Sequence, residues 1–160
     1  MSATNPASPD EDDGSTRDEV REELTIRTGV EGLTPARVAT LYRRAPLLRP
    51  VDDLDQLWEM FEHSSLIISA WYRDRLVGIA RVLTDTLFIS YLCDLAVEPD
   101  VQRLGIGRSL INEVLQHTQG TELVLRDSDI SSSFYDQLGF ERVDNAWAWP
   151  RDRSNEELMS

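Results

Sequence analysis

A loop with two glycines stands in the middle of this chain, between an apolar run and an amphipathic segment. The loop covers residues 102–107 (Gln-Arg-Leu-Gly-Ile-Gly), the apolar run covers 88–97, and apolar residues recur at helical spacing after the loop. Glycine lets the backbone approach a ligand closely, because no Cβ intervenes. The unpaired N–H groups at the start of the following helix, together with the helix dipole, favour an anion at the same place. The spacing therefore predicts a phosphate-binding loop.

Two common phosphate-binding motifs do not fit this loop. A Walker loop requires a lysine, whereas all 16 basic residues of this chain are arginines. A dinucleotide-binding fingerprint requires a third glycine, and this chain has Leu110 at that position. The pattern that remains is Gln-x-x-Gly-x-Gly.

A second motif follows about 30 residues later at 133–140 (Ser-Phe-Tyr-Asp-Gln-Leu-Gly-Phe). Phe134 and Leu138 lie four residues apart on one face of a predicted short helix, and Gly139 is the usual left-handed cap. Between the two motifs, residues 122–125 are typical of a strand. In this order the two motifs resemble those of the GNAT (Gcn5-related N-acetyltransferase) superfamily.

The resemblance implies an α/β (α+β) domain with the GNAT fold. Its sheet is mixed, mostly antiparallel, splayed after the fourth strand and flanked by about four helices. The residue patterns predict elements in the same order, with a hairpin about Arg73–Asp74 and a helix opened by Thr34 and Pro35. The expected strands are 24–27, 65–72, 75–84, 88–97, 121–126 and 140–148, and the expected helices are near 35–42, 51–61, 105–118 and 130–138.

The resemblance also implies a cosubstrate, acetyl-CoA, and the residues that bind it. The pantetheine arm is expected along the fourth strand at Leu95, Ala96 and Val97, with a hydrogen bond from Ser128. Tyr135 matches the family's tyrosine near the sulfur and is expected to protonate the departing thiolate. The pyrophosphate is expected on backbone amides of the loop, with Gln102 and Arg108 as side-chain support; the amide set is Arg103, Leu104, Gly105, Ile106, Gly107, Arg108 and Ser109.

The general base is less sharply indicated by the sequence. Asp94 is the only carboxylate within the apolar run, and a buried carboxylate is costly unless it has a partner or a function. Two roles stay open for it: the base that deprotonates the amine, or a structural anchor that caps a loop or pairs with an arginine such as Arg81. Strand alternation places Asp94 on the face opposite Tyr91 and Cys93. The lone cysteine excludes an intramolecular disulfide and is interpreted as a buried thiol.

Composition predicts one domain between two tails. Residues 1–23 hold eight acids and two arginines and lack apolar periodicity. We expect a disordered acidic tail at 1–22, an acetyltransferase domain at 23–150 and a flexible tail at 151–160. No basic and apolar leader or bilayer-length apolar run occurs, so a cytoplasmic protein without a membrane partner is expected. The net charge of −13 argues against nucleic acid, and no residue cluster has metal-ligand spacing.

The acceptor is expected to be a primary amine of a small molecule. Segments 41–50 and 76–81 resemble a subgroup with plastid-type and arylalkylamine-like acetyltransferases. Aromatic residues in the acceptor regions could hold an amine by cation–π contact; they are Tyr42, Trp58, Trp71, Trp147 and Trp149. Trp147 and Trp149, placed on one face of the last strand, are alternatively a homodimer surface. Two other functions stay open: acetylation of a protein lysine or N-terminus, and a non-catalytic acyl-CoA-binding regulator.

Overall fold

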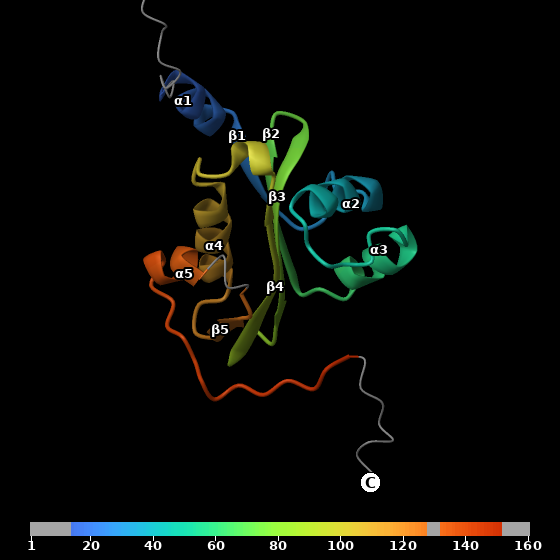
Figure 1. The fold of residues 1–160 in the computed structure, drawn as a ribbon, viewed down its shortest axis with the longest axis vertical. Helices are drawn as coiled ribbons and strands as arrows, with labels where there is room; N and C mark the ends of the chain where they lie inside the picture. Colours follow the sequence, from blue (N-terminus) through green and yellow to red (C-terminus); the bar gives the residue numbers. More distant parts are fainter. Residues whose placement is uncertain (1–13, 128–131, 152–160) are drawn as a thin grey trace, which may run out of the picture. The chain divides into compact units, whose positions relative to one another are not determined.

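The computed structural model describes residues 14–127 and 132–151. The chain divides into two units, Met1–Arg126 and Asp127–Ser160, which are described separately. The first contains one sheet with the strand order β1-β2-β3-β4-β5 (Figure 1). Its strands are β1 (Leu24–Thr28), β2 (Leu66–Tyr72), β3 (Arg75–Thr84), β4 (Ile89–Val97) and β5 (Glu122–Leu125). Its helices are α1 (Gly14–Glu22), α2 (Pro35–Arg44), α3 (Leu54–Glu62), the 3-10 turn η1 (Pro99–Val101) and α4 (Ile106–His117).

Strands β1 to β4 form an antiparallel meander, and β5 joins β4 in parallel. The parallel pairing starts at Ile89, opposite Glu122, and ends at Leu92, opposite Leu125. Past that point, residues 93–97 of β4 have no pairing on the β5 side within the described chain. The expected splay after the fourth strand is therefore confirmed.

Local signals in the sequence account for the two helices on one face of the sheet, α2 and α3 (Figure 1). The Thr34 side chain accepts a hydrogen bond from the Arg37 N–H, and Pro35 occupies the first turn of α2. Asp53 caps α3 in the same way, so that helix begins at Leu54 rather than at residue 51. Both caps satisfy N–H groups that the helix itself leaves unpaired.

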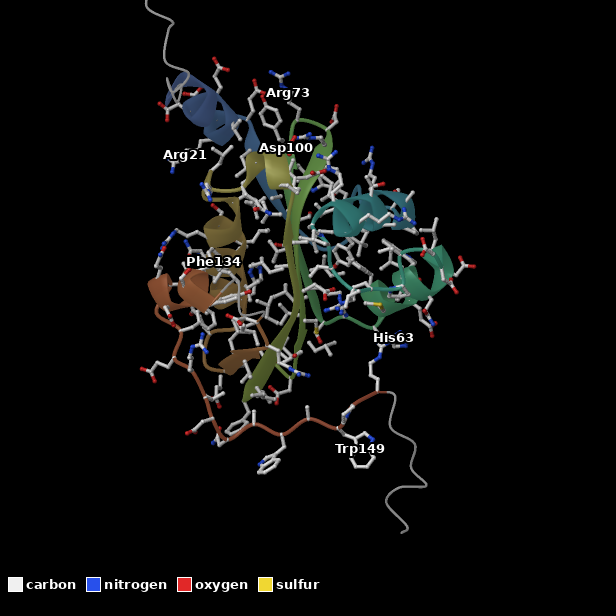
Figure 2. The ribbon with its side chains drawn as sticks, in the orientation of Figure 1. Arg21, His63, Arg73, Asp100, Phe134 and Trp149 are labelled. Atoms are coloured by element: carbon white, nitrogen blue, oxygen red, sulfur yellow. The ribbon has the colours of Figure 1, made fainter. Side chains whose placement is uncertain are left out.

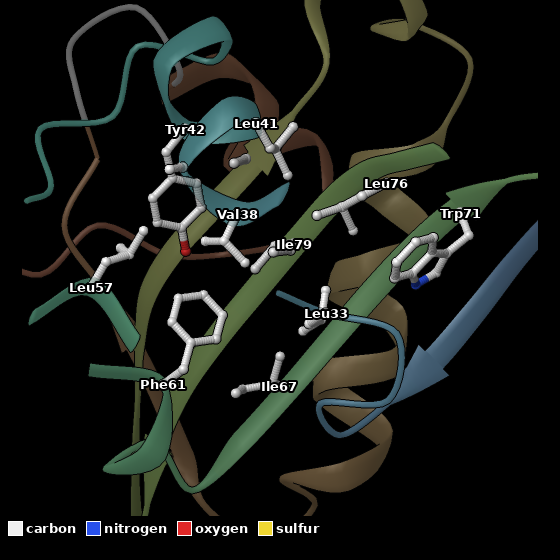
Figure 3. Close-up of a cluster of buried hydrophobic side chains, with 12 residues drawn as sticks. Leu33, Val38, Leu41, Tyr42, Leu57, Phe61, Ile67, Trp71, Leu76 and Ile79 are labelled. Atoms are coloured by element: carbon white, nitrogen blue, oxygen red, sulfur yellow. The ribbon is translucent and has the colours of Figure 1, made fainter. Parts of the chain in front are cut away.

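The main core lies between these two helices and the sheet (Figure 3). Tyr42, Phe61 and Trp71 are its largest members and are almost fully buried. The Tyr42 and Phe61 ring centroids are 6.2 Å apart, and Trp71 donates its indole N–H to Ser69 Oγ at 2.8 Å. Tyr42 and Trp71, which the sequence suggested as possible walls of an acceptor site, are thus core residues.

Helix α4 covers the opposite face of the sheet (Figure 1). Its buried residues are Ile106, Leu110, Ile111 and Val114, at the predicted helical spacing. Gly78 of β3 allows the close packing, because a Cβ at Gly78 would lie 2.9 Å from Leu110 Cδ1 and 3.2 Å from Ile106 Cγ2. The start of α4 is therefore held tightly against β3.

The second unit contains helix α5 (Ser132–Gln137). Gly139 follows it with φ of 88°, which confirms the predicted left-handed cap. The expected helix start at residues 130 and 131 lies outside the described residues, as does Ser128.

One sequence expectation about the N-terminal end of the chain differs from the structure. Residues 14–22, expected within a disordered tail, form α1, where Val20 is 7% exposed. Burial of this one apolar residue gives the polar helix a packing face that composition did not indicate. Residues 1–13 and 152–160 lie outside the described chain.

The predicted strand 140–148 is wrong. No strand occurs between residues 140 and 151, and every residue from 141 to 151 is exposed. A strand requires a hydrogen-bonded neighbour, and no described strand pairs with this segment. Trp147, 99% exposed, and Trp149 therefore do not share a face of a sheet.

Candidate functional site: the edge of β4 and the glycine loop

The glycine loop lies between η1 and α4, at the end of β4. Gly105 is the N-cap residue of α4, with φ of 86°, and no side chain caps the helix. The first N–H bonded within the helix is that of Ser109, which donates to the Gly105 carbonyl at 3.0 Å. The N–H groups before it are thus available to an anion, at the positive end of a 12-residue helix dipole. An uncapped helix N-terminus after a glycine is the geometry that an anion site requires, and phosphate binding by this loop stays a prediction.

Some side chains around the loop form hydrogen bonds within the protein, and others are exposed to solvent. Gln102 Nε2 donates to the Val97 carbonyl at 3.1 Å, and Ser109 Oγ donates to the Gly105 carbonyl at 3.1 Å. These contacts hold the loop against the end of β4 and the start of α4. Arg103 and Arg108 are exposed, so their guanidinium groups can reach a ligand.

Sequence reasoning missed Arg21 as a neighbour of the loop. Its Nη2 lies 3.9 Å from the position that a Cβ would take at Gly105. Figure 2 labels Arg21 at the end of α1. Because α1 was assigned to a tail, no signal in the sequence placed this arginine near residue 105. Its charge adds to that of Arg103 and Arg108.

The unpaired part of β4 leads into this loop. Leu95 and Val97 are half-buried, whereas Ala96, between them, is 2% exposed and belongs to the core. Among the described residues, the edge of β4 after Leu92 and the N-terminus of α4 both leave backbone groups unpaired, with η1 and the glycine loop between them.

Exposure alternates along β4, but the pairing with β3 shifts between Arg81–Asp94 and Val82–Leu92, so a β-bulge at Cys93 interrupts the alternation of faces. Tyr91, paired with Leu83, therefore lies on the same face as Asp94, paired with Arg81, and the predicted placement of these two residues on opposite faces is wrong.

Asp94 lies at the centre of a buried polar network on the core side of β4. Its carboxylate has no exposed area and accepts hydrogen bonds from three donors. Oδ2 accepts from Tyr42 Oη at 2.8 Å and from Arg81 Nε at 2.6 Å, and Oδ1 accepts from Arg49 Nε at 2.7 Å. Arg49 also donates to the Cys93 carbonyl at 2.9 Å. The pairing of Asp94 with Arg81 is confirmed.

This network affects the titration of Tyr42 strongly. Burial, and then the negative charge of Asp94, raise the pKa of Tyr42 well above its usual value. The phenol therefore stays protonated and remains a hydrogen-bond donor to the carboxylate. Burial also raises the pKa of the Cys93 thiol, which makes a thiolate nucleophile unfavourable.

Tyr135 belongs to the second unit, where two aromatic rings surround it. Its ring centroid lies 5.1 Å from that of Phe134 and 5.5 Å from that of Phe140, both in edge-on contact. Burial, with a smaller effect of Asp127, raises the pKa of Tyr135 to about 12. The phenol is fully protonated at neutral pH, as a proton donor must be.

Trp58 is the aromatic acceptor candidate that remains beside a pocket. It stacks on Phe61 with centroids 5.8 Å apart and planes 2° apart, and both rings line a pocket of about 590 Å³. Residues 14–127 and 132–151 contain no cluster of His, Cys, Asp or Glu that could hold a metal ion. No helix among them is long and apolar enough to cross a membrane.

Comparison with known families agrees with this architecture. The family description "Acetyltransferase (GNAT) domain" matches residues 46–148. The chain therefore belongs to the GNAT acetyltransferase family, and it is a mixed α/β member with a five-stranded sheet.

Individual relatives and solved structures are similar to parts of this chain or to its fold. The chain is 33% identical over 87 residues to an uncharacterized N-acetyltransferase, ycf52, of Porphyra purpurea. These residues make up 49% of this chain and 49% of that protein. The chain thus spans about half the length of the curated relatives it matches. A GNAT-family acetyltransferase structure from Streptococcus pneumoniae superposes with a TM-score of 0.67 at 26% identity, over 81% of this chain and 99% of that one. The structure of the PaiA N-acetyltransferase of Thermoplasma acidophilum in complex with coenzyme A superposes with a TM-score of 0.60 at 16% identity. The match covers 77% of this chain and 92% of that one.

Proposed function

We propose that this chain transfers the acetyl group of acetyl-CoA directly to a primary amine of a small molecule, in a ternary complex. One observation carries the proposal: the unpaired edge of β4 runs into an uncapped helix N-terminus through a glycine loop. A pantetheine arm needs backbone partners along an extended path, and a pyrophosphate needs converging N–H groups. Both occur here in the required order.

In this proposal the backbone of Leu95 to Val97 binds the pantetheine arm, and the amides of residues 103–109 bind the pyrophosphate. Arg103, Arg108 and Arg21 neutralise its charge. Gln102 and Ser109 act as positioning residues, because their side chains hold the loop itself. Ser128, outside the described residues, keeps its proposed hydrogen bond to the pantetheine arm.

Tyr135 is proposed to protonate the departing thiolate, and the pKa values set a condition on that step. Its pKa of about 12 lies well above the value of about 8.5 for a free thiol. Proton transfer to a thiolate in water would therefore cost about 5 kcal/mol. The step requires the thiolate to leave into a dry environment that raises its own pKa by a comparable amount.

For Asp94, the contacts favour the anchor over the general base. A base must present a free lone pair to the amine, directly or through one water. The carboxylate instead accepts from Tyr42, Arg49 and Arg81 on the core side of the sheet. We therefore propose that Asp94 is a positioning residue that ties the segment before α3 to β4, and that water removes the ammonium proton.

The test is calorimetric titration with acetyl-CoA, followed by thiol release with a panel of amines. We expect micromolar binding and amine-dependent thiol release. Arg21→Gln, Arg103→Gln and Arg108→Gln should each weaken binding several-fold, whereas Arg43→Gln, on the outer side of α2, should leave it unchanged. If acetyl-CoA binds but no small amine causes thiol release, the acceptor is instead a protein lysine or N-terminus, or the chain is a non-catalytic acyl-CoA-binding regulator. Absence of binding would refute the proposal.

A further inference from the structure

The free edge of β4, beyond its pairing with β5, offers a defined set of backbone groups. Glu98 directly follows β4, and its N–H donates to the Val77 carbonyl of β3 at 2.9 Å, so these two residues form a hydrogen-bonded pair of the β3–β4 ladder. Such pairs alternate with pairs whose N–H and C=O groups point away from the other strand. By this alternation, the N–H and C=O groups of Leu95 and Val97 point away from β3. They face the edge along which no described strand pairs with β4.

A side chain occupies the carbonyl group at each end of this edge. Gln102 Nε2 donates to the Val97 carbonyl at 3.1 Å, next to the glycine loop. Arg49 Nη2 donates to the Cys93 carbonyl at 2.9 Å, at the bulge where β5 separates from β4. Between these two contacts the edge presents the Leu95 N–H, the Leu95 carbonyl and the Val97 N–H, in the order donor, acceptor, donor. The three groups span one two-residue repeat of the strand, about 7 Å.

The Arg49 guanidinium is held firmly at its end of the edge. Each of its three nitrogen atoms donates a hydrogen bond: Nε to Asp94 Oδ1 at 2.7 Å, Nη1 to the Leu48 carbonyl at 2.6 Å and Nη2 to the Cys93 carbonyl. The Arg49 side chain is 27% exposed, whereas the Asp94 carboxylate has no exposed area. A planar guanidinium that is bonded through all of its nitrogens cannot swing aside without losing several contacts at once.

Neutralisation of Asp94 does not by itself account for Arg49. Arg81, with 10% of its side chain exposed, donates to Asp94 Oδ2 at 2.6 Å and already balances the charge of the carboxylate. Tyr42 also donates to Oδ2, and its raised pKa keeps the phenol neutral. Two arginines against one carboxylate leave a positive charge in excess, and Arg49 is the more exposed of the two. Besides this charge, Arg49 contributes the contact with the β4 backbone.

We propose that Arg49 closes the acyl end of this edge, so that the site selects an acetyl group over longer acyl chains. The inference rests on the proposed function, in which the pyrophosphate lies at the glycine loop and the acyl group therefore at the Leu95 end of the edge. The next group along the edge is the Cys93 carbonyl, which Arg49 covers. An acetyl group extends one carbon past the thioester carbonyl, whereas a hexanoyl group extends five. The longer chain must bend away from the strand or displace the guanidinium, which leaves buried polar groups without partners.

The test compares acetyl-CoA, butyryl-CoA and hexanoyl-CoA by calorimetry on the full chain, without an amine so that no acyl group is transferred. We expect the wild-type chain to bind hexanoyl-CoA about tenfold more weakly than acetyl-CoA, with butyryl-CoA between them. Equal affinities for the three would overturn this inference and leave the proposed function standing. Absence of binding by all three would refute the proposed function and this inference with it.

Variants separate a stop for the acyl chain from a purely structural role. Arg49→Ala leaves Asp94 paired with Arg81 and should fold, which the melting temperature checks. It should raise the affinity for hexanoyl-CoA about tenfold, while the affinity for acetyl-CoA changes by less than about threefold. Gln102→Ala, at the other end of the edge, is the matched control and should weaken the binding of all three ligands alike.

If Arg49→Ala does not fold, Arg49→Lys takes its place, because a single ammonium can pair with Asp94 but has no fork to cover the Cys93 carbonyl as well. The ratio of the hexanoyl-CoA and acetyl-CoA affinities should then rise in the same direction. A ratio that stays at the wild-type value in a folded Arg49 variant, with all three affinities changed in parallel or not at all, would overturn the inference.

Discussion

Tyr135 is the residue whose chemistry the proposed reaction uses most directly. Tyr135→Phe removes the hydroxyl but keeps the ring that contacts Phe134 and Phe140. We expect turnover to fall at least about tenfold, because the thiolate then leaves without a proton, while the affinity for acetyl-CoA changes by less than about threefold. Thiol-release kinetics and calorimetry measure the two quantities. A variant with the wild-type rate would remove Tyr135 from the mechanism.

Asp94 is the residue whose loss should matter most for stability. Asp94→Asn leaves Arg81, with 10% of its side chain exposed, and Arg49 without their charged partner. We expect the free energy of unfolding to fall by about 3–5 kcal/mol, measured by urea denaturation. Arg43→Gln, which breaks the exposed pair with Asp52, is the control and should cost less than about 1 kcal/mol.

A pH profile separates the two roles of Asp94. If the carboxylate is the general base, Asp94→Asn should remove the rise of turnover with pH that deprotonation of this group produces, in addition to the loss of stability. If it is only an anchor, stability should fall but the shape of the pH profile should persist in the fraction that remains folded. The network of three donors leads us to expect the second result.

At the scale of elements, the glycine loop and helix α4 depend on two glycines for different reasons. Gly105 has a positive φ, and a Cβ there would meet no protein atom closer than 3.9 Å. Gly105→Ala should therefore fold, with a loss of about 1–2 kcal/mol from backbone strain, yet bind acetyl-CoA at least about tenfold more weakly. The larger Gly105→Val should abolish binding by blocking the pyrophosphate.

Gly78→Ala is the matched comparison in the core. The added methyl would lie 2.9 Å from Leu110 Cδ1 and 3.2 Å from Ile106 Cγ2, so these side chains or α4 must shift, and stability should fall by about 1–3 kcal/mol. Thermal denaturation and calorimetry on both variants distinguish the effects. Gly105→Ala with wild-type affinity would contradict the loop assignment.

The elements also differ in how far the sequence predicts them. Thr34 and Pro35 mark the start of α2 correctly, because a cap is a contact between residues three apart. Helix α1 was missed, since its polar sequence is stabilised by the burial of one residue, Val20. The strand at 140–148 was wrong for the converse reason: its alternating pattern is local, but a strand needs a partner that the sequence does not show.

At the scale of the whole molecule, two tyrosines with raised pKa values should make the folded state less stable at high pH. The pKa of Tyr42 is raised well above its usual value by burial and by Asp94, and that of Tyr135 is raised to about 12. Above pH of about 10 the unfolded chain releases these protons and the folded chain retains them. The unfolded state then binds fewer protons, so stability is complete below about pH 10 and falls as pH rises.

We expect each tyrosine to lower the free energy of unfolding by up to about 1.4 kcal/mol per pH unit above pH 10, up to its own folded pKa. Melting temperatures between pH 8 and pH 11 measure the decline. Tyr42→Phe should make the decline shallower, although it costs the hydrogen bond to Asp94 at neutral pH. A melting temperature that stays constant through this range would contradict the raised pKa values of both phenols.

The sequence by itself determined the loop at 102–107, the helix after it, the cap at Gly139 and membership of the family, because all depend on contacts or motifs within a few residues. Only the tertiary structure decided the partners of Asp94. Tyr42, Arg49 and Arg81 lie 52, 45 and 13 residues from it along the chain. The same holds for Arg21 near Gly105 and for Arg49 at the Cys93 carbonyl. Such contacts form when α1 and α2 pack near the sheet, and the pattern of residues along one segment carries no record of which distant side chain will meet it.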